Sequence, residues 1–436
     1  MIDPVALLAE LVRIPSENPL FRPAGSGVAP TPGGAPACGV APGVLPGEAR
    51  LALYLESLFA SLGISTLRVP VLPGRDNLLA WIEGRPSSGG HRRVVLIDAH
   101  QDTVSADGMT VEPFGAELRD GRLYGRGACD TKGGMAAAIV AAARLLADPP
   151  PAMPSLLLAF TVNEEHGFDG ARRLADVWGR APNTADETAE VVHRANQGDA
   201  RLAVPFPMVR PDAVVVLEPT ELDVVVAHKG VVRWRAVARG RPAHSSRPDD
   251  GLNAIYRMAR AVTAIERYAE EVLARREADA LCGRPTLCVS TIHGGTSVNT
   301  VPDRCSILLD RRLAPGETPE AARRELVDAL DAEGLARLVE HEPPQLCAPA
   351  LMPTPASRAL ARRLAAAVES VCRTTCAERG AAYATNAACY AEAGVPAVVF
   401  GPGSIAQAHT ADEWIAVDQV VQAAAVIERF VRAEAG

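Results

Sequence analysis

The chain alternates short apolar runs with segments of helical periodicity over its first half and again near its end. Continuous apolar runs are typical of strands that a sheet buries on both faces, and they occur at RRVVLIDAH (92–100), PSLLLAFTV (154–162), DAVVVLEP (212–219) and PAVVFGPG (396–403). STLRVP (65–70) and NLLAWIEG (77–84) are also strand-like. Helical periods lie at 3–14, about 47–62, 132–147, about 168–178, 357–371 and about 417–434. This order predicts an α/β domain whose mostly parallel sheet is covered by helices.

The pattern changes between residues 230 and 344. VVRWRAVARG alternates like a half-buried strand, and the residues after it predict a helix at about 251–275, strands at 285–295 and 305–313, a helix at 318–332 and a last strand at 335–342. This β-α-β-β-α-β order is ferredoxin-like. We therefore expect a larger domain of residues 1–229 and 345–436, interrupted by a smaller α+β domain of residues 230–344. A Pro/Gly-rich loop at 22–47 and a polar insertion at 180–208 break the pattern.

The composition limits the kinds of molecule that the protein is expected to bind. Of the 436 residues 22% are charged, and the formal net charge of −8 argues against a general nucleic-acid binder, because phosphate binding needs a cationic surface. No run approaches 18 apolar residues, so we expect no membrane span, and the N-terminus lacks the basic start of a signal peptide. The nine cysteines are scattered without a CxxC motif. We interpret Cys372 and Cys376 as packed thiols rather than ligands, and we expect a reducing cytoplasm.

Groups that can bind a metal follow the ends of the apolar runs. They are His100, Asp102, Asp130, Glu164, Glu165, Glu218 and His409. Each has an ordinary alternative: Asp130 before a helix is a potential N-cap, a Glu pair commonly begins a solvated loop, and Glu218 before a proline suits a turn. Ligands of open α/β sheets bind at the carboxyl ends of strands, however, and mixed His and carboxylate chemistry suits Zn²⁺. The recurrence therefore favours one metal site.

The motifs around these residues resemble a known family. AHQDTV, GRGACDTKGG, TVNEEHG, EPT, GRPAHSSRP and GPGSIAQAHTADE, in this order, are similar to motifs of the acetylornithine deacetylase / succinyl-diaminopimelate desuccinylase family. That family belongs to the aminoacylase-like and carboxypeptidase-like di-zinc metallohydrolases. The resemblance runs through nearly the whole chain. It implies a zinc-exopeptidase-like catalytic domain, and it implies that residues 230–344 form a lid and dimerisation domain.

The resemblance also implies two Zn²⁺ ions, for which Co²⁺ can substitute, and a role for each polar group. Asp130 would bridge the two ions, with His100 and Glu218 completing one site and Glu165 and His409 the other. Glu164 would be the general base that takes a proton from the attacking water and delivers it to the leaving amine. Because residues two apart on a strand face the same side, we expect the carboxylate of Asp102 to accept the second imidazole N–H of His100.

On the substrate side, the resemblance points to four residues. His244 would reach a neighbouring subunit's site and stabilise the oxyanion, Asn299 in GGTSVNTVPD would lie near substrate, and Arg312 in DRRLAPG would clamp the α-carboxylate. Gly403 lies in FGPGS, whose small residues offer free backbone N–H groups. Alternatively, His244 is an exposed loop histidine, Arg312 is a surface residue paired with Asp310, and Glu413 is either a support for the site or solvated. Ser105 departs from the family, which often has proline there.

We therefore expect an amidohydrolase that releases a carboxylate and a free amine from a small N-acylated amino acid. GPGSIAQAH is closest to acetylornithine deacetylase, which makes N-acetyl-L-ornithine the first substrate. Succinyl-diaminopimelate desuccinylation, general N-acyl-amino-acid deacylation and small-dipeptide hydrolysis are alternatives. A single-metal hydrolase and an inactive binding protein on the same fold are further ones. The expected protein is a cytoplasmic homodimer that binds neither nucleic acid nor membrane.

Overall fold

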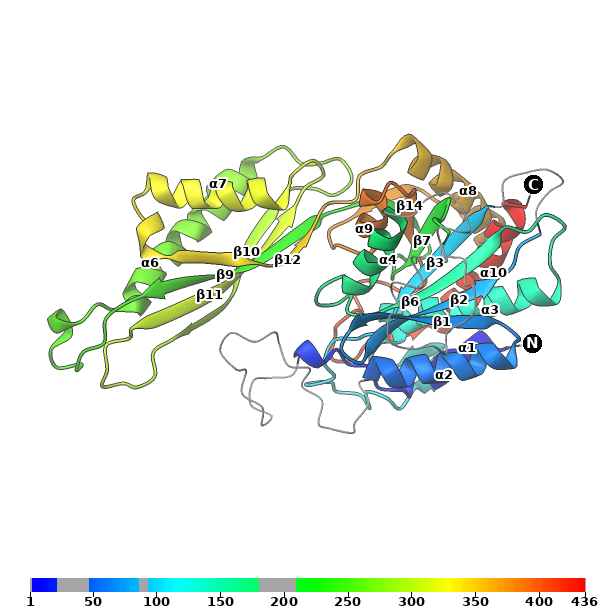
Figure 1. The fold of residues 1–436 in the computed structure, drawn as a ribbon, viewed down its shortest axis with the longest axis horizontal. Coiled ribbons are helices and arrows are strands. Elements are labelled where there is room, and N and C mark those ends of the chain that lie inside the picture. Colours follow the sequence, from blue (N-terminus) through cyan, green and yellow to red (C-terminus); the bar gives the residue numbers. More distant parts are fainter. Residues whose placement is uncertain (1, 22–46, 86–92, 180–208, 436) are drawn as a thin grey trace. The chain divides into compact units, whose positions relative to one another are not determined.

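The computed structural model describes residues 2–21, 47–85, 93–179 and 209–435 (Figure 1). The two segments that break the sequence pattern, 22–46 and 180–208, lie outside the described residues. The chain divides into two compact units. The larger unit comprises Met1–Val226, Pro353–Arg379 and Thr385–Gly436, and the smaller comprises Ala227–Met352 and Gly380–Ala384. Among the described residues, no helix is both long and apolar enough to cross a membrane.

A mixed sheet of eight strands forms the centre of the larger unit, in the order β1-β2-β6-β3-β7-β14-β8-β13. The strands are β1 (Ser65–Leu72), β2 (Arg75–Ile82), β3 (Val94–His100), β6 (Ser155–Thr161), β7 (Ala213–Leu217), β8 (Val224–His228), β13 (Glu378–Ala381) and β14 (Ala397–Phe400). Strand β3 pairs in parallel with β6 and β7, and β14 pairs in parallel with β7. The pairs β1–β2, β2–β6 and β8–β14 are antiparallel. The parallel centre is buried throughout, as continuous apolar runs predict.

Helices cover this sheet, and their ends follow ordinary capping chemistry. They are α1 (Pro4–Val12), α2 (Gly47–Ser61), α3 (Gly133–Ala147), α4 (Asp169–Gly179), α8 (Pro355–Cys372), α9 (Ala387–Glu392) and α10 (Val417–Ala433). Asp3 caps α1 by accepting from the amides of Val5 and Ala6, and Thr354 caps α8. The Ala-rich helix α3 is buried along most of its length and packs against α1 and α10. The predicted α/β domain covered by helices is therefore confirmed, although its sheet is mixed rather than mostly parallel.

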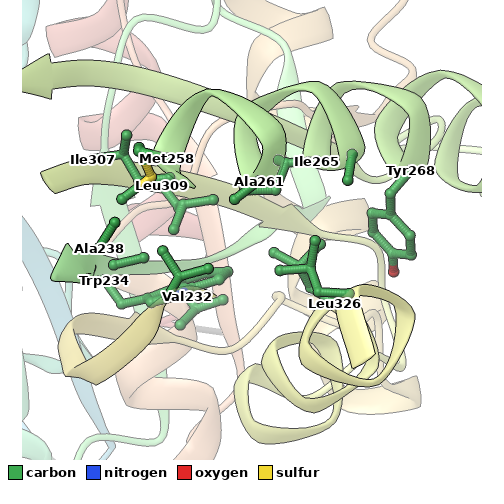
Figure 2. Close-up of a cluster of buried hydrophobic side chains, with 14 of the residues drawn as sticks. Val232, Trp234, Ala238, Met258, Ala261, Ile265, Tyr268, Ile307, Leu309 and Leu326 are labelled. Carbon is green, nitrogen blue, oxygen red and sulfur yellow. The ribbon is translucent and has the colours of Figure 1, made fainter. Parts of the chain in front are cut away.

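The smaller unit has the predicted β-α-β-β-α-β order. Its elements are β9 (Gly230–Arg239), α6 (Ala254–Arg267), β10 (Thr286–Gly294), β11 (Arg304–Leu313), α7 (Pro319–Ala332) and β12 (Glu340–Ala348). The antiparallel sheet has the order β10-β11-β9-β12, and its apolar face packs on α6 and α7. Figure 2 shows this core, in which Trp234 of β9 and Leu309 of β11 lie with Met258 and Ile265 of α6 and Leu326 of α7.

The last strand of this unit is misplaced in the sequence prediction. LARLVEHE predicts a strand at 335–342, but Ala336–Leu338 form a 3₁₀ turn and the strand runs from Glu340 to Ala348. Leu335 and Leu338 pack against the core instead of pairing. The true strand contains two consecutive prolines and shifts register beside them, which an edge strand tolerates because one side of its backbone is unpaired. The predicted helix at 251–275 also ends its regular part at Arg267.

A second sheet of three very short strands, in the order β15-β5-β4, has no counterpart in the sequence prediction. The strands are β4 (Glu117–Arg119), β5 (Arg122–Tyr124) and β15 (Trp414–Ala416). Three residues are too few to show a period. This sheet matters for the site, because β15 begins directly after Glu413 and β5 leads into the turn that carries Asp130.

Candidate metal centre

Three neighbouring parallel strands bring their carboxyl ends, and the polar residues at those ends, to one edge of the sheet. Strand β3 ends at His100, β6 leads into Glu164 and Glu165, and β7 leads into Glu218. The order β6-β3-β7 makes these ends adjacent. Asp130 lies in an irregular turn, Ala128–Lys132, just before α3, and its peptide bond to Thr131 is cis. His409 comes from the loop after β14 and has a positive φ of 63°.

Asp130 stands between two groups of potential metal ligands. Its Oδ1 lies 2.9 Å from His100 Nε2, and its Oδ2 lies 3.3 Å from His409 Nε2. His409 Nε2 is also 3.1 Å from a carboxylate oxygen of Glu165. The first group consists of His100, Asp130 and Glu218, and the second consists of Asp130, Glu165 and His409. Within each group, the potential ligand atoms lie within 4.8 Å of one another. The two oxygens of Asp130 thus face opposite groups, as a bridging carboxylate requires.

The electrostatics of the cluster favour bound cations. Burial, followed by repulsion from Asp130, raises the pKa of Glu218 well above its usual value, and burial does the same to the pKa of Glu164. Burial alone would raise the pKa of Asp130 as well, but hydrogen bonds with His100 and His409 lower it. Among the described residues, Glu218 Oε1 is buried without a hydrogen-bond partner. Crowded carboxylates with such an orphaned oxygen fit a divalent cation, which supplies the missing partner and offsets the repulsion.

The proton position on His100 suits metal binding by Nε2. His100 Nδ1 lies 2.8 Å from the main-chain carbonyl oxygen of Asp102, which can only accept a hydrogen bond. Nδ1 therefore carries a hydrogen, so Nε2, which faces Asp130 Oδ1 at 2.9 Å, is the nitrogen that would bind a metal after losing its own hydrogen.

This hydrogen bond corrects the expectation that the carboxylate of Asp102 accepts from His100. The carboxylate oxygen Oδ1 is 3.8 Å from Nδ1, beyond hydrogen-bond distance. The carboxylate accepts instead from the backbone amides of Glu164, at 3.0 Å, and of Glu165, at 3.2 Å. Because the chain after β3 turns its carbonyl toward the ring, the carboxylate is free to bind the neighbouring loop. Asp102 therefore holds the backbone of the glutamate pair.

Glu413 is buried and binds the turn that carries Asp130, so it is not solvated. Its Oε1 accepts from the amides of Cys129, at 2.9 Å, and of Asp130, at 3.1 Å. Its Oε2 accepts from Arg126 Nη1 at 2.6 Å. The carboxylate thus fixes the Asp130 backbone through charge-assisted hydrogen bonds.

The smaller unit brings His244 and Asn299 together. Ser245 N donates to the carbonyl oxygen of Asn299 at 3.0 Å, and His244 pairs with Thr300 in an isolated bridge. The ring of His244 is exposed, and Ser246 N donates to its Nδ1 at 3.2 Å. Nδ1 therefore accepts, and Nε2 carries the hydrogen as an outward donor.

Arg312 lies on β11 in the same unit, and its Nε donates to Asp310 Oδ1 at 2.8 Å. This is the pairing expected of a surface arginine. The guanidinium has further N–H groups, so the pair leaves it able to bind a second carboxylate.

The backbone of Gly403 is already committed, contrary to the expectation of a free N–H group. Its amide donates to Gln419 Oε1 at 2.7 Å, and its carbonyl accepts from Glu221 N at 2.7 Å. A packing requirement explains the glycine: its φ is +88°, and a Cβ would stand 2.6 Å from Cys129 Sγ. Ser105, where the family often has proline, instead closes a turn by accepting from the amide of Asp107 at 3.1 Å.

Sequence reasoning missed a buried polar network beneath the glutamate pair. Asn18 Nδ2 donates to Asp102 Oδ2 at 2.8 Å and to Asn163 Oδ1 at 2.7 Å. Glu48 forms a buried ion pair with Arg75 and accepts from Asn163 N at 3.1 Å. The only sequence signal is the placement of polar residues in IPSENP, next to a helix whose apolar period has ended.

Known proteins resemble this chain over most of its length. The family model described as Peptidase family M20/M25/M40 matches residues 96–433. An acetylornithine deacetylase of Myxococcus xanthus is 32% identical over 392 residues, which cover 87% of this chain and 90% of that protein. An acetylornithine deacetylase of Proteus mirabilis is 31% identical over 370 residues, which cover 84% of each.

A solved structure shows the same fold. It is a Bacillus subtilis protein described as a dinuclear metal-binding peptidase from the M20 family. It matches with a TM-score of 0.62 and 15% sequence identity, covering 99% of this chain and 96% of that chain. At this identity the likeness concerns the fold alone.

Proposed function

Because the chain belongs to peptidase family M20/M25/M40, we propose that it deacylates a small N-acylated amino acid, with N-acetyl-L-ornithine as the first substrate. The family and its deacetylase relatives make it a hydrolase that acts on amide bonds. The choice of acyl group and amino acid is supported by the identity of 31–32% to two acetylornithine deacetylases. Such a reaction would serve amino-acid biosynthesis.

The observation that carries the proposal is the placement of Asp130 between two ligand groups. We assign one Zn²⁺ to His100, Asp130 and Glu218 and a second to Asp130, Glu165 and His409, with Co²⁺ as a substitute. Zinc bound there would supply Lewis acidity, which polarises an amide carbonyl and lowers the pKa of water to about 7. Carboxylate and imidazole donors at a buried strand edge are the ligands that catalytic zinc takes.

Glu164 is the general base in this mechanism. It is buried beside both ligand groups and belongs to neither, so its carboxylate is available to the reacting water. Glu164 takes a proton as the water oxygen bonds to the carbonyl carbon. It then gives that proton to the amide nitrogen as the C–N bond breaks, and the amine leaves.

His244 supplies the oxyanion donor, through Nε2–H, from a second copy of the chain. Hydrogen bonding at Nδ1 from Ser246 supports this role because it fixes the tautomer that exposes a donor. We assign Arg312 to the α-carboxylate of the substrate, since a guanidinium binds a carboxylate through two parallel hydrogen bonds, and we place Asn299 near the substrate. This assignment entails a homodimer, which light scattering of the purified protein tests.

We also propose a cytoplasmic location. The cysteines in the described part of the chain are thiols rather than disulfides, which suits a reducing compartment. Cys372 and Cys376 belong to neither ligand group, in keeping with their interpretation as packed thiols.

A substrate panel tests the function. The full chain, stripped with chelator and reloaded with Zn²⁺ or Co²⁺, is assayed for free amine from N-acetyl-L-ornithine, N-succinyl-diaminopimelate, other N-acetyl and N-formyl amino acids, and dipeptides. We expect the highest kcat/KM on N-acetyl-L-ornithine and none from the stripped protein. If another panel member has the highest kcat/KM, that compound replaces N-acetyl-L-ornithine as the proposed substrate. If no panel member is hydrolysed, the protein is a binding protein on the same fold.

A further inference from the structure

Glu164 lies in a turn that is held by its own backbone hydrogen bonds, such as Gly167 N to the carbonyl of Asn163 at 3.0 Å, and also by hydrogen bonds from outside it. The chain leaves β6 through Asn163, whose φ is +60°, in the left-handed region that asparagine adopts more readily than most residues. The next two amides, of Glu164 and Glu165, both donate to the carboxylate of Asp102. The direction of the Glu164 side chain is therefore set by the positions of Asn163 and Asp102.

A single side chain, Asn18, connects these two supports. Its Nδ2 donates to Asp102 Oδ2 at 2.8 Å and to Asn163 Oδ1 at 2.7 Å, and its Oδ1 accepts from Leu20 N at 3.1 Å. The assignment of the amide nitrogen is forced, because a carboxylate oxygen only accepts. Asn18 is 1% exposed, so bulk water does not compete with these bonds in the folded protein.

The backbone around Asn18 is anchored to the same edge of the sheet. Asn18 N donates to the carbonyl of Thr103 at 2.8 Å, and Thr103 N donates to that of Ser16 at 3.1 Å. Lys132, two residues from Asp130, donates from Nζ to the carbonyl of Ile14 at 2.8 Å. The segment is thus fixed to the loop after β3 and to the turn before α3, and the Asn18 side chain reaches from it to the loop after β6.

We propose that Asn18 is a positioning residue, which holds Glu164 in the orientation needed for proton transfer by bridging Asp102 and Asn163. The inference rests on the proposed role of Glu164 as general base. An asparagine fits this position because the two N–H groups of its amide donate to the two acceptors, Asp102 and Asn163. An aspartate here would instead place a carboxylate, which cannot donate, against both acceptors. Loss of the bridge lets the glutamate turn relax. Glu165 stays anchored through its side chain to His409 in its ligand group, and the other ligands lie outside the turn, so Glu164, which belongs to neither group, is the residue that moves.

The test compares Asn18→Ser and Asn18→Asp with a matched control, Asn386→Ser. Asn386 is equally buried, and its Nδ2 also donates to a carboxylate, Asp98 Oδ2 at 2.9 Å, and to a second acceptor, Thr161 Oγ1 at 3.0 Å. It touches neither Asp102 nor Asn163 through these bonds. Both serine variants therefore lose the same kind of hydrogen bonds and should show similar drops in melting temperature.

We expect kcat on the best panel substrate to fall about 10–100-fold in Asn18→Ser, with KM and metal content unchanged, because small misplacements of a catalytic group have effects of that size. The kcat of Asn18→Asp should be lower still. If Asn18→Asp fails to fold, Asn18→Ser alone provides the test. Asn386→Ser should keep kcat within about threefold. The inference would be overturned if Asn18→Ser had wild-type kcat, lost metal, or changed only its KM. It would also be overturned if the fall in kcat of Asn18→Ser were no larger than that of the Asn386→Ser control.

Glu164→Gln is measured alongside to separate two failures. If Glu164→Gln turns over like wild type, the proposed general base is wrong and the inference falls with it. If Glu164→Gln is inactive while both Asn18 variants keep wild-type kcat, only the positioning role of Asn18 is wrong.

Discussion

Replacing Glu164 by glutamine should separate proton transfer from metal binding. Glutamine has nearly the same shape, and the backbone amide that Asp102 holds is unchanged by the substitution. Glu164 belongs to neither ligand group, so both metal ions should stay. A general base contributes about 10²–10⁴-fold, which corresponds to about 2.7–5.4 kcal/mol of activation free energy. We expect kcat to fall by that factor with little change in KM.

The neighbouring residue provides the matched control, since Glu165→Gln is the same chemical change one position along the chain. Glu165 lies in a ligand group with Asp130 and His409, so its loss should weaken metal binding by more than about 100-fold, because even outer partners of metal ligands contribute about 10–100-fold. The assay pairs amine release with the metal-to-protein ratio after desalting, measured by mass spectrometry. Equal metal depletion in both variants, or more than a tenth of wild-type turnover in Glu164→Gln, would refute the division of roles.

Three further predictions test other parts of the molecule. His244→Ala should lower kcat about 10²–10³-fold with metal content unchanged, whereas His293→Ala, an exposed histidine of the same unit, should have no effect. Glu413→Ala breaks a buried pair with Arg126 and should lower the free energy of unfolding by about 3–5 kcal/mol and also weaken metal binding. Glu428→Ala, which removes a partly exposed pair, should cost less than about 0.5 kcal/mol in urea unfolding. Burial, reinforced by Arg323, lowers the pKa of His341 from 6.5 to about 4. The unfolded chain therefore binds more protons between these values, and the stabilisation from neutral His341 is lost as pH falls from 6.5 to 4. His341→Gln keeps an acceptor for Trp234 but does not titrate. In fluorescence-monitored urea unfolding, its free energy of unfolding should therefore fall less between about pH 7.5 and about pH 5 than that of the wild type. An equal fall in both proteins would contradict this prediction.

Local patterns in the sequence predict that several candidate ligands lie at one edge of the sheet, whereas their division into two groups comes from the resemblance to a known family. Each apolar run marks a strand, and in a parallel sheet the carboxyl ends of neighbouring strands meet. His100 and Glu218 could therefore be placed at one edge without knowledge of the loops. The same reasoning covers Glu165, which lies just beyond the end of β6.

What the sequence could not predict depends on long-range contacts or on single dihedral angles. Asn18 acts on residues 84 and 145 positions away, and no periodicity relates them. Whether Asp102 offers its carbonyl or its carboxylate to His100 is decided by the turn after β3, which the residue type does not determine. Strand β12 was misplaced because prolines argue against a strand unless it is known to lie at an edge.

The Glu164–Glu165 pair depends both on the local sequence pattern and on long-range contacts. Adjacent like charges in a buried strand end are unfavourable by themselves, and burial raises the pKa of both Glu164 and Glu165. Their side chains are nevertheless placed differently, because only Glu165 contacts His409 and joins a ligand group. A cation beside Glu165 would remove much of the repulsion that Glu164 experiences, so a metal there would make an ionised Glu164 tolerable where burial alone would not. Asp102 gives the backbone of both residues one common anchor, which in the proposed mechanism would keep one carboxylate directed at a metal while the other remains available for the proton.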